Sequence, residues 1–246
     1  MNIKITVSES AEENGRRAAK KIAELIRAAI ESKGRARIVV STGSSQFEMF
    51  SALIKEEIDW TRVIMFHLDE YVGLPESHIA SFRKYLKERF VSLVPIKEAH
   101  FVNGEGDIDK NIKELTIELR KEPIDVGIIG IGENGHIAFN DPPADFTTDE
   151  AYKVVVLDTK CRMQQVGEGW FETIDDVPEK AISMMPKEIM KAEHIVTVAP
   201  HSVKAKAIYD TITHRVSPDV PATLLKTHPD WNLFIDDDSA AMLFGK

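Results

Sequence analysis

The sequence predicts an α/β fold in which a mainly parallel sheet carries helices on both faces. Two observations lead to it. Short apolar runs recur along the 246 residues, and amphipathic stretches of ten or more residues separate most of them. Strands joined through such helices need crossover connections, which make neighbouring strands parallel. No internal repeat, low-complexity tract or long linker interrupts the alternation, so we expect one domain over residues 1–246.

Each expected element rests on a local pattern. Residues 3–7 form an apolar strand, and residues 9–32 form a helix whose apolar side chains recur at the spacing of one buried face. Residues 37–41 contain the β-branched run Ile-Val-Val, which fits a strand buried on both faces. A helix then carries Phe47 and Phe50. The remaining expected elements are a strand at 63–68, helices near 78–93 and 108–121, and strands at 124–131, 153–157, 195–199 and 232–235.

Composition excludes several classes of protein. The formal charge is −9 and no basic block stands out, so a nucleic-acid partner is not expected. No apolar run approaches the roughly 18 residues of a membrane span, and the first residues lack the pattern of a secretory signal. Cys161 is the single cysteine, which fits a reducing compartment. We expect a cytoplasmic protein without a membrane partner, and a small anionic ligand remains compatible with the charge.

Residues 41–45 (Ser-Thr-Gly-Ser-Ser) lie between a predicted strand and a predicted helix. Free amides at a helix start, its partial positive charge and nearby hydroxyls together favour an anion-binding loop. A plain turn with a serine N-cap is typical of the same residues. The pattern leaves both interpretations open.

A second polar cluster, residues 67–74, places the adjacent carboxylates Asp69 and Glu70 after a predicted strand. In open parallel sheets, ligands bind at the carboxyl ends of the strands. Neighbouring side chains of an extended segment point to opposite faces, so we expect only one carboxylate to enter a pocket. An exposed acidic loop is the alternative interpretation.

A third cluster, residues 130–142, contains Gly-x-Gly-x-x-Gly after a strand, as dinucleotide-binding proteins do. That fingerprint needs a helix directly behind it, whereas Pro142 and Pro143 indicate a turn. We therefore expect no nicotinamide or flavin, and glycines that let the backbone approach a ligand. His136 and Asp141 could form a pair in which the acid orients the ring, while a structural histidine in a tight loop is the alternative.

A metal cofactor is not predicted either. The remaining histidines show neither His-Glu-x-x-His nor paired Cys-x-x-Cys spacing. No Gly-x-Ser-x-Gly elbow indicates a serine hydrolase. We expect the protein to act without a metal or an organic cofactor.

Two segments resemble the signature motifs of glucosamine-6-phosphate deaminases. Residues 68–75 read Leu-Asp-Glu-Tyr-Val-Gly-Leu-Pro, and residues 130–142 read Gly-Ile-Gly-Glu-Asn-Gly-His-Ile-Ala-Phe-Asn-Asp-Pro. Their order and spacing are similar to that family over nearly the whole chain. The related 6-phosphogluconolactonases typically carry Asp-Glu-Arg in the first motif and Gly-His-Thr-Ala-Ser-Leu-Phe in the second, unlike this sequence. The resemblance implies a single-domain, Rossmann-like fold.

The resemblance also implies roles for individual residues. Asp69 matches the base that moves the C2 proton during aldose–ketose isomerisation, and His136 matches the residue that assists ring opening. Asn134 and Asp141 fall where the family places polar partners of this histidine. The residues that match phosphate-binding positions are Thr42, Gly43, Ser44, Ser45 and Lys204.

Three departures from the family stand out. Asp141 replaces a longer glutamate, which shortens its reach toward His136. Residues 158–180 resemble the mobile lid, but its phosphate-binding arginine has no clean match; Arg162 is the nearest candidate, and Gln165 or Gly169 takes the aligned position. The regulatory signature of allosteric members is missing, because the aligned residues are Ala144, Asp145, Ala151 and Lys153, of which only Lys153 is kept.

The resemblance implies conversion of glucosamine 6-phosphate and water to fructose 6-phosphate and ammonia. Three alternatives stay open: the same chemistry on the galactosamine epimer, hydrolysis of 6-phosphogluconolactone, and sugar-phosphate sensing without turnover. The presence of both Asp69 and His136 argues against a sensor. The expected partner is a small sugar phosphate, and a homo-oligomer is possible on this sequence.

Overall fold

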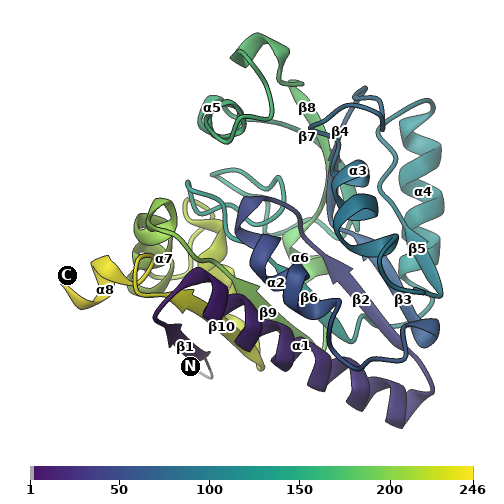
Figure 1. The fold of residues 1–246 in the computed structure, drawn as a ribbon. Helices are drawn as coiled ribbons and strands as arrows, with labels where there is room; N and C mark the ends of the chain where they lie inside the picture. The colour runs from purple at the N-terminus through teal and green to yellow at the C-terminus, as the bar shows by residue number, and fades with distance from the viewer. Residues whose placement is uncertain (1–2, 246) are drawn as a thin grey trace.

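The computed structural model describes residues 3–245 and has at its centre a seven-stranded sheet (Figure 1). Its strand order is β1-β10-β9-β6-β2-β3-β5, and every neighbouring pair is parallel. The strands are β1 (Ile3–Ser8), β2 (Ala36–Val40), β3 (Val63–His67), β5 (Glu98–His100), β6 (Val126–Ile129), β9 (His194–Val198) and β10 (Trp231–Asp236). The predicted α/β class with a mainly parallel sheet is confirmed.

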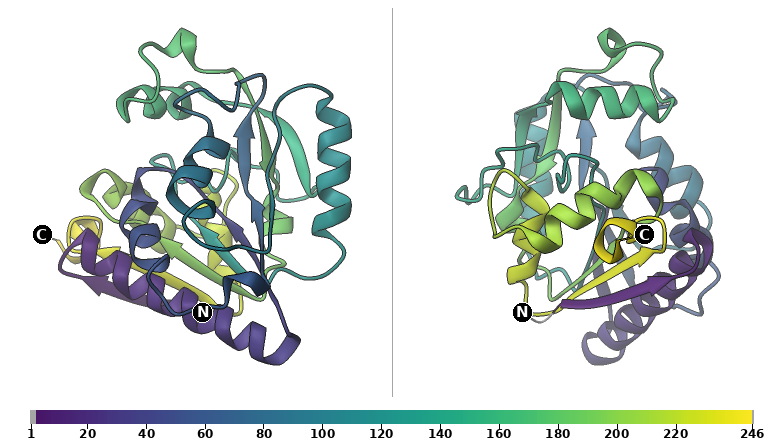
Figure 2. Two further views of the ribbon diagram at one scale, coloured as in Figure 1. Left: turned by 45° about the vertical axis from the view of Figure 1, so that its right-hand side comes forward. Right: turned by 90° about the vertical axis from the view of Figure 1, so that its left-hand side faces the viewer.

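Helices cover both faces of this sheet (Figures 1 and 2). On one face, α1 (Ala11–Lys33), α2 (Phe47–Leu53) and α3 (Phe82–Leu86) pack over a core that includes Ile38 and Val40. On the other face, α4 (Ile108–Leu119), α6 (Pro186–Ile189) and α7 (Ala205–Thr213) pack over a core that includes Val39. Successive side chains of a strand point to opposite faces, so β2 is buried on both, as its continuous apolar sequence predicts. A last short helix is α8 (Ala241–Phe244).

Helix α1 shows how local residues set the ends of an element. Ser10 accepts a hydrogen bond from the Glu13 amide at the N-terminus, and Gly34 ends the helix with φ = 77°. Between them, Ile22, Leu25 and Ile26 are buried on one face, as their spacing predicts. Helix α1 begins two residues later and ends one residue later than the helix expected at residues 9–32.

The strand expected at 153–157 forms, but not in the parallel sheet. β7 (Tyr152–Val156) pairs with β8 (Lys180–Met184), which in turn pairs with β4 (Asp69–Tyr71), all antiparallel. Residues 138–151 contain no helix that could carry the chain back for a parallel crossover. The expectation that this strand belongs to the parallel sheet was therefore wrong. The small sheet and α5 (Thr159–Gly167) stand beyond the end of the main sheet in Figure 1.

The helix expected near 78–93 is also shorter than predicted. It begins at Phe82, and its second half (Lys87–Val91) is π-helical.

Within residues 3–245, no helix combines the length and the apolarity that crossing a membrane would require.

Candidate active site

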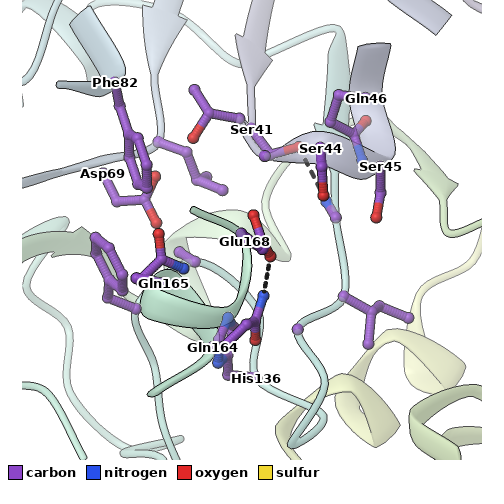
Figure 3. A pocket seen from close by; sticks show the side chains of 18 of the residues that line it. Ser41, Ser44, Ser45, Gln46, Asp69, Phe82, His136, Gln164, Gln165 and Glu168 are labelled. Atoms are coloured by element: carbon purple, nitrogen blue, oxygen red, sulfur yellow. Dashed lines mark hydrogen bonds between the residues drawn. The ribbon is translucent and has the colours of Figure 1, made fainter. Parts of the chain in front are cut away.

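A cavity opens where β2, β3, β6 and β9 of the main sheet end (Figure 3). This is the edge at which parallel α/β sheets bind ligands, because loops diverge there and helices begin. The space inside it that is open to water-sized molecules is about 70 Å³. All three polar clusters that the sequence singled out contribute to its lining.

Asp69 and Glu70 point in opposite directions from β4, as the alternation of an extended segment predicts. Asp69 lines the cavity, and its carboxylate accepts no hydrogen bond from residues 3–245. Burial, and then the charge of Glu70, raise the pKa of Asp69 well above its usual range. Glu70 turns inward and accepts hydrogen bonds from Ser81 Oγ (2.8 Å) and from the Arg83 amide (2.9 Å). Asp69 therefore faces a ligand with its proton affinity increased, while Glu70 anchors the segment behind it.

His136 lies in the cavity wall with its ring held by Asp141. Nδ1 of His136 is 3.0 Å from Oδ1 of Asp141, so the shorter acid does reach the ring. Asn134 Nδ2 donates to the same carboxylate oxygen, and the Asp158 amide donates to the other. Burial acts to raise the pKa of Asp141, but the hydrogen bond and charge of His136, with these two donors, hold it below its usual value. The carboxylate thus stays charged and fixes the ring, which leaves Nε2 for a ligand.

The close approach of the His136 ring requires a glycine at position 132. A Cβ at position 132 would lie 2.2 Å from His136 Nε2. Gly132 therefore makes room for an imidazole rather than for a pyrophosphate.

The loop at 41–45 has the features of an anion site more than those of a simple cap. Ser41 Oγ accepts from the Gly130 amide (3.0 Å), which ties the ends of β2 and β6 together (Figure 3). Thr42, Ser44 and Ser45 line the cavity, and their hydroxyls form no hydrogen bond inside the described part of the chain. Gly43 adopts φ = 109°, which a side chain would disfavour. Unused hydroxyls and the first amides of a helical segment face the same space.

Lys204 supplies a cation beside this loop. Its side chain is 4% exposed, lines the cavity, and has no hydrogen-bond partner among residues 3–245. Burial lowers the pKa of Lys204, and the nearby charges of Glu168 and Glu133 act in the opposite direction. Holding a buried ammonium without a partner is costly, and an anionic ligand would relieve that cost.

Helix α5 and the residue that follows it cover the cavity on the side away from the main sheet, and they bring Gln164, Gln165 and Glu168 into its lining. The Tyr71 hydroxyl donates to Gln165 Oε1 (2.8 Å), so the amide nitrogen of Gln165 remains available. Arg162 is placed elsewhere: its guanidinium donates to the carbonyls of Ile174 (2.6 Å) and Val177 (3.1 Å). These contacts keep Arg162, the nearest candidate for a phosphate-binding arginine, outside the cavity lining in this structure.

Sequence reasoning missed several lining residues. Gln164, Glu168 and Phe82 follow no motif and reach the cavity only because α5 and α3 pack around it. Asn134 and Asp141, which the resemblance implies as polar partners of His136, lie beside this histidine and outside the cavity lining.

One group near the site has metal-ligand chemistry. Ligand atoms of His136, Asp141 and Cys161 lie within 4.8 Å of one another. Burial, and then the charge of Asp141, raise the pKa of the Cys161 thiol, which disfavours the thiolate that would bind a metal. The carboxylate is already shared among three donors. The arrangement fits a hydrogen-bonded histidine better than a metal centre.

Comparison with known proteins agrees with this geometry. A glucosamine-6-phosphate deaminase of Halothermothrix orenii is 38% identical over 242 residues, covering 94% of this chain and 98% of the relative. One from Listeria welshimeri is 35% identical over 232 residues, covering 94% and 97%.

Solved structures extend the comparison. A monomeric glucosamine-6-phosphate deaminase superposes with a TM-score of 0.88 at 27% identity, covering 97% of this chain and 99% of that one. The 6-phosphogluconolactonase of Thermotoga maritima shares the fold, with a TM-score of 0.80 at 15% identity and coverage of 96% and 100%. The profile of glucosamine-6-phosphate isomerases/6-phosphogluconolactonase matches residues 9–233, and the chain belongs to this family.

Proposed function

We propose that this protein converts glucosamine 6-phosphate and water to fructose 6-phosphate and ammonia. The observation that carries the proposal is the convergence on one cavity of an acid–base pair, Asp69 and His136, with a buried, unpartnered Lys204. Relatives bearing the deaminase name at 35–38% identity over 94% of the chain support the same reaction. An isomerising enzyme needs both halves of this cavity, a base for carbon-bound protons and a holder for the phosphate.

The phosphate is bound by Lys204 and by the free donors of residues 42–45. An ammonium and several amides and hydroxyls meet at one place, which suits a dianion with several acceptor oxygens. Because the phosphate does not react, these contacts fix the sugar's position relative to Asp69 and His136.

The reaction then needs two proton movements. His136 assists opening of the pyranose at the ring oxygen, oriented by Asp141. Asp69 takes the proton from C2 and returns it to C1, while a proton from the amine passes to O1, so that the aldehyde and amine become a C1 hydroxyl and a C2 imine. Water adds to the imine, ammonia leaves, and the ketose phosphate remains. No metal or nicotinamide takes part in these steps.

Ammonia release in the presence of glucosamine 6-phosphate tests the proposal. The galactosamine epimer and 6-phosphogluconolactone should be assayed beside it, each with and without a chelator. We expect the gluco substrate to give the highest kcat/KM, unaffected by the chelator. Faster lactone hydrolysis, or binding of all three compounds without turnover, would replace the proposal by one of the alternatives.

We expect Asp141→Asn to lower kcat by about 10- to 100-fold, since an amide no longer offers a charge that orients the ring and stabilises its protonated form. KM should change little, because Asp141 does not line the cavity. Steady-state kinetics over pH 5–9 would measure both. Asp145→Asn, at an exposed carboxylate four residues further along the chain and outside the cavity lining, is the matched control. An unchanged kcat in Asp141→Asn would remove Asp141 from the mechanism.

We also expect hyperbolic kinetics. Ala144 and Ala151 offer no polar side chain, and Asp145 accepts hydrogen bonds from Thr147 and Thr148. Lys153 pairs with Glu150 at 3.4 Å. An allosteric anion site needs free donors, and a coupling free energy needs a second site. Initial rates with and without the N-acetylated sugar phosphate measure this; sigmoidal curves that become hyperbolic on its addition would contradict it.

We propose further that residues 158–180 act as a lid over the cavity. They join β7 to β8, away from the main sheet (Figure 2), and contribute three lining side chains, Gln164, Gln165 and Glu168. A cytoplasmic location belongs to the same proposal, since amino-sugar phosphates are intracellular metabolites. We also propose that the protein forms a homo-oligomer. Size-exclusion chromatography with light scattering would measure the oligomeric state.

A further inference from the structure

Glu168 places a carboxylate in the cavity, on the side that the lid helix covers (Figure 3). It lies just beyond the C-terminus of α5, and each of its oxygens is held by one donor. Gln164 Nε2 donates to Oε1 (2.7 Å), and Trp170 Nε1 donates to Oε2 (3.0 Å). Gln164 is held in turn, because its Oε1 accepts from the Glu133 amide (3.2 Å). The carboxylate is therefore positioned by neighbours on two segments, and each oxygen keeps a lone pair for a ligand.

The charge of the cavity is mixed as a result. Lys204 is the one lysine or arginine among the described residues that line it, while Arg162 is held by backbone carbonyls outside. Glu168 is close enough that its charge acts on Lys204. The lid thus presents two amides and one carboxylate to the ligand, with no cation of its own.

We propose that Glu168 recognises the C2 ammonium of an amino-sugar phosphate and so selects this class over sugar phosphates without an amine. The inference rests on the proposed function and names the residue that sets its substrate class. At neutral pH the substrate carries a phosphate dianion at one end and an ammonium at C2. Lys204 with residues 42–45 serves the dianion, and Glu168 serves the ammonium.

A carboxylate at this place disfavours the binding of sugar phosphates that carry no amine. With a ketose phosphate or a lactone phosphate, Lys204 would pair with the dianion, and the ligand would bring no cation for the Glu168 carboxylate. An amino sugar supplies that cation from its own structure. The same contact disappears when ammonia leaves, so Glu168 favours release of the ketose phosphate product.

The experiment compares two unreactive ligands that differ only in the amine: 2-amino-2-deoxyglucitol 6-phosphate and glucitol 6-phosphate. Neither has a carbonyl group, so neither is turned over. Dissociation constants at pH 7 are measured by calorimetry on the full chain. We expect the unaltered protein to bind the amino compound at least about tenfold more tightly, as a hydrogen-bonded charge pair contributes. In Glu168→Gln this preference should fall below about threefold.

Glu172→Gln, at an exposed carboxylate of the same lid, is the matched control and should keep the full preference. If Glu168→Gln retains the preference, the ammonium is bound elsewhere and the inference is wrong. If the variant binds both ligands more tightly by the same factor, Glu168 merely occupies the place of the phosphate, which also overturns it. Failure of the unaltered protein to bind either compound, or to release ammonia from glucosamine 6-phosphate, would instead refute the proposed function.

Discussion

Replacing Asp69 with Asn is expected to lower kcat by about 10² to 10⁴-fold, the usual contribution of a placed general base. The amide keeps the shape of the side chain but cannot accept the C2 proton, so KM should stay close to that of the unaltered protein. Steady-state ammonia release measures both constants. A variant that retains more than about a tenth of the original kcat would exclude Asp69 as the base.

Stability provides a control for this variant, because burial raises the pKa of Asp69. The folded state then holds the proton more tightly than the unfolded chain, so stability falls as pH rises from the unfolded pKa through the folded one. Asp69→Asn removes that loss and should raise the melting temperature at neutral pH. Glu70→Gln, which disturbs the contacts to Ser81 and Arg83, should lower it instead.

The raised pKa of Asp69 has a second consequence, in the pH profile of activity. A general base must be deprotonated, so kcat/KM should fall on the acid side at a pH above the ordinary carboxyl value of about 4. This acid limb should be absent from the residual activity of Asp69→Asn. A limb that persists unchanged would belong to another group.

Lys204→Met is expected to raise KM by about 10²-fold or more, because the phosphate loses its buried charge partner. The phosphate contacts are similar in the ground state and the transition state, so kcat should change much less. Competitive inhibition by inorganic phosphate should weaken by a similar factor. Equal inhibition of both proteins would place the phosphate away from Lys204.

The same substitution should stabilise the fold. Burial lowers the pKa of Lys204, so over the range between its folded and unfolded pKa the unfolded chain binds more protons and stability rises with pH. At neutral pH the buried ammonium is a cost, and removing it should increase the free energy of unfolding by about 0.5–2 kcal/mol. Lys206→Met, at an exposed lysine paired with Asp210, serves as the control and should change neither KM nor stability appreciably.

Local patterns were enough to predict much of the fold. The apolar spacing of residues 22–30 and the β-branched run at 38–40 are strong signals. A helix buried on one face and a strand buried on two each require a distinct pattern of apolar residues. The short strands β4, β5 and β8 have no comparable apolar pattern. Each has five residues or fewer and is stabilised by pairing with a neighbour that is distant in the chain, such as Asp69–Tyr71 with Ala181–Ser183.

The sequence by itself determined the α/β class, the positions of three polar clusters and the opposed directions of Asp69 and Glu70, because all of these depend on local periodicity. Only the tertiary structure decided which side chains share the cavity. Gln164 and Glu168 enter it because α5 and the residue that follows it pack across the cavity, beyond the end of the main sheet, whereas the carbonyls of Ile174 and Val177 hold Arg162 outside. The unpartnered state of Lys204 likewise results from packing of segments far apart in the chain, which no local pattern records.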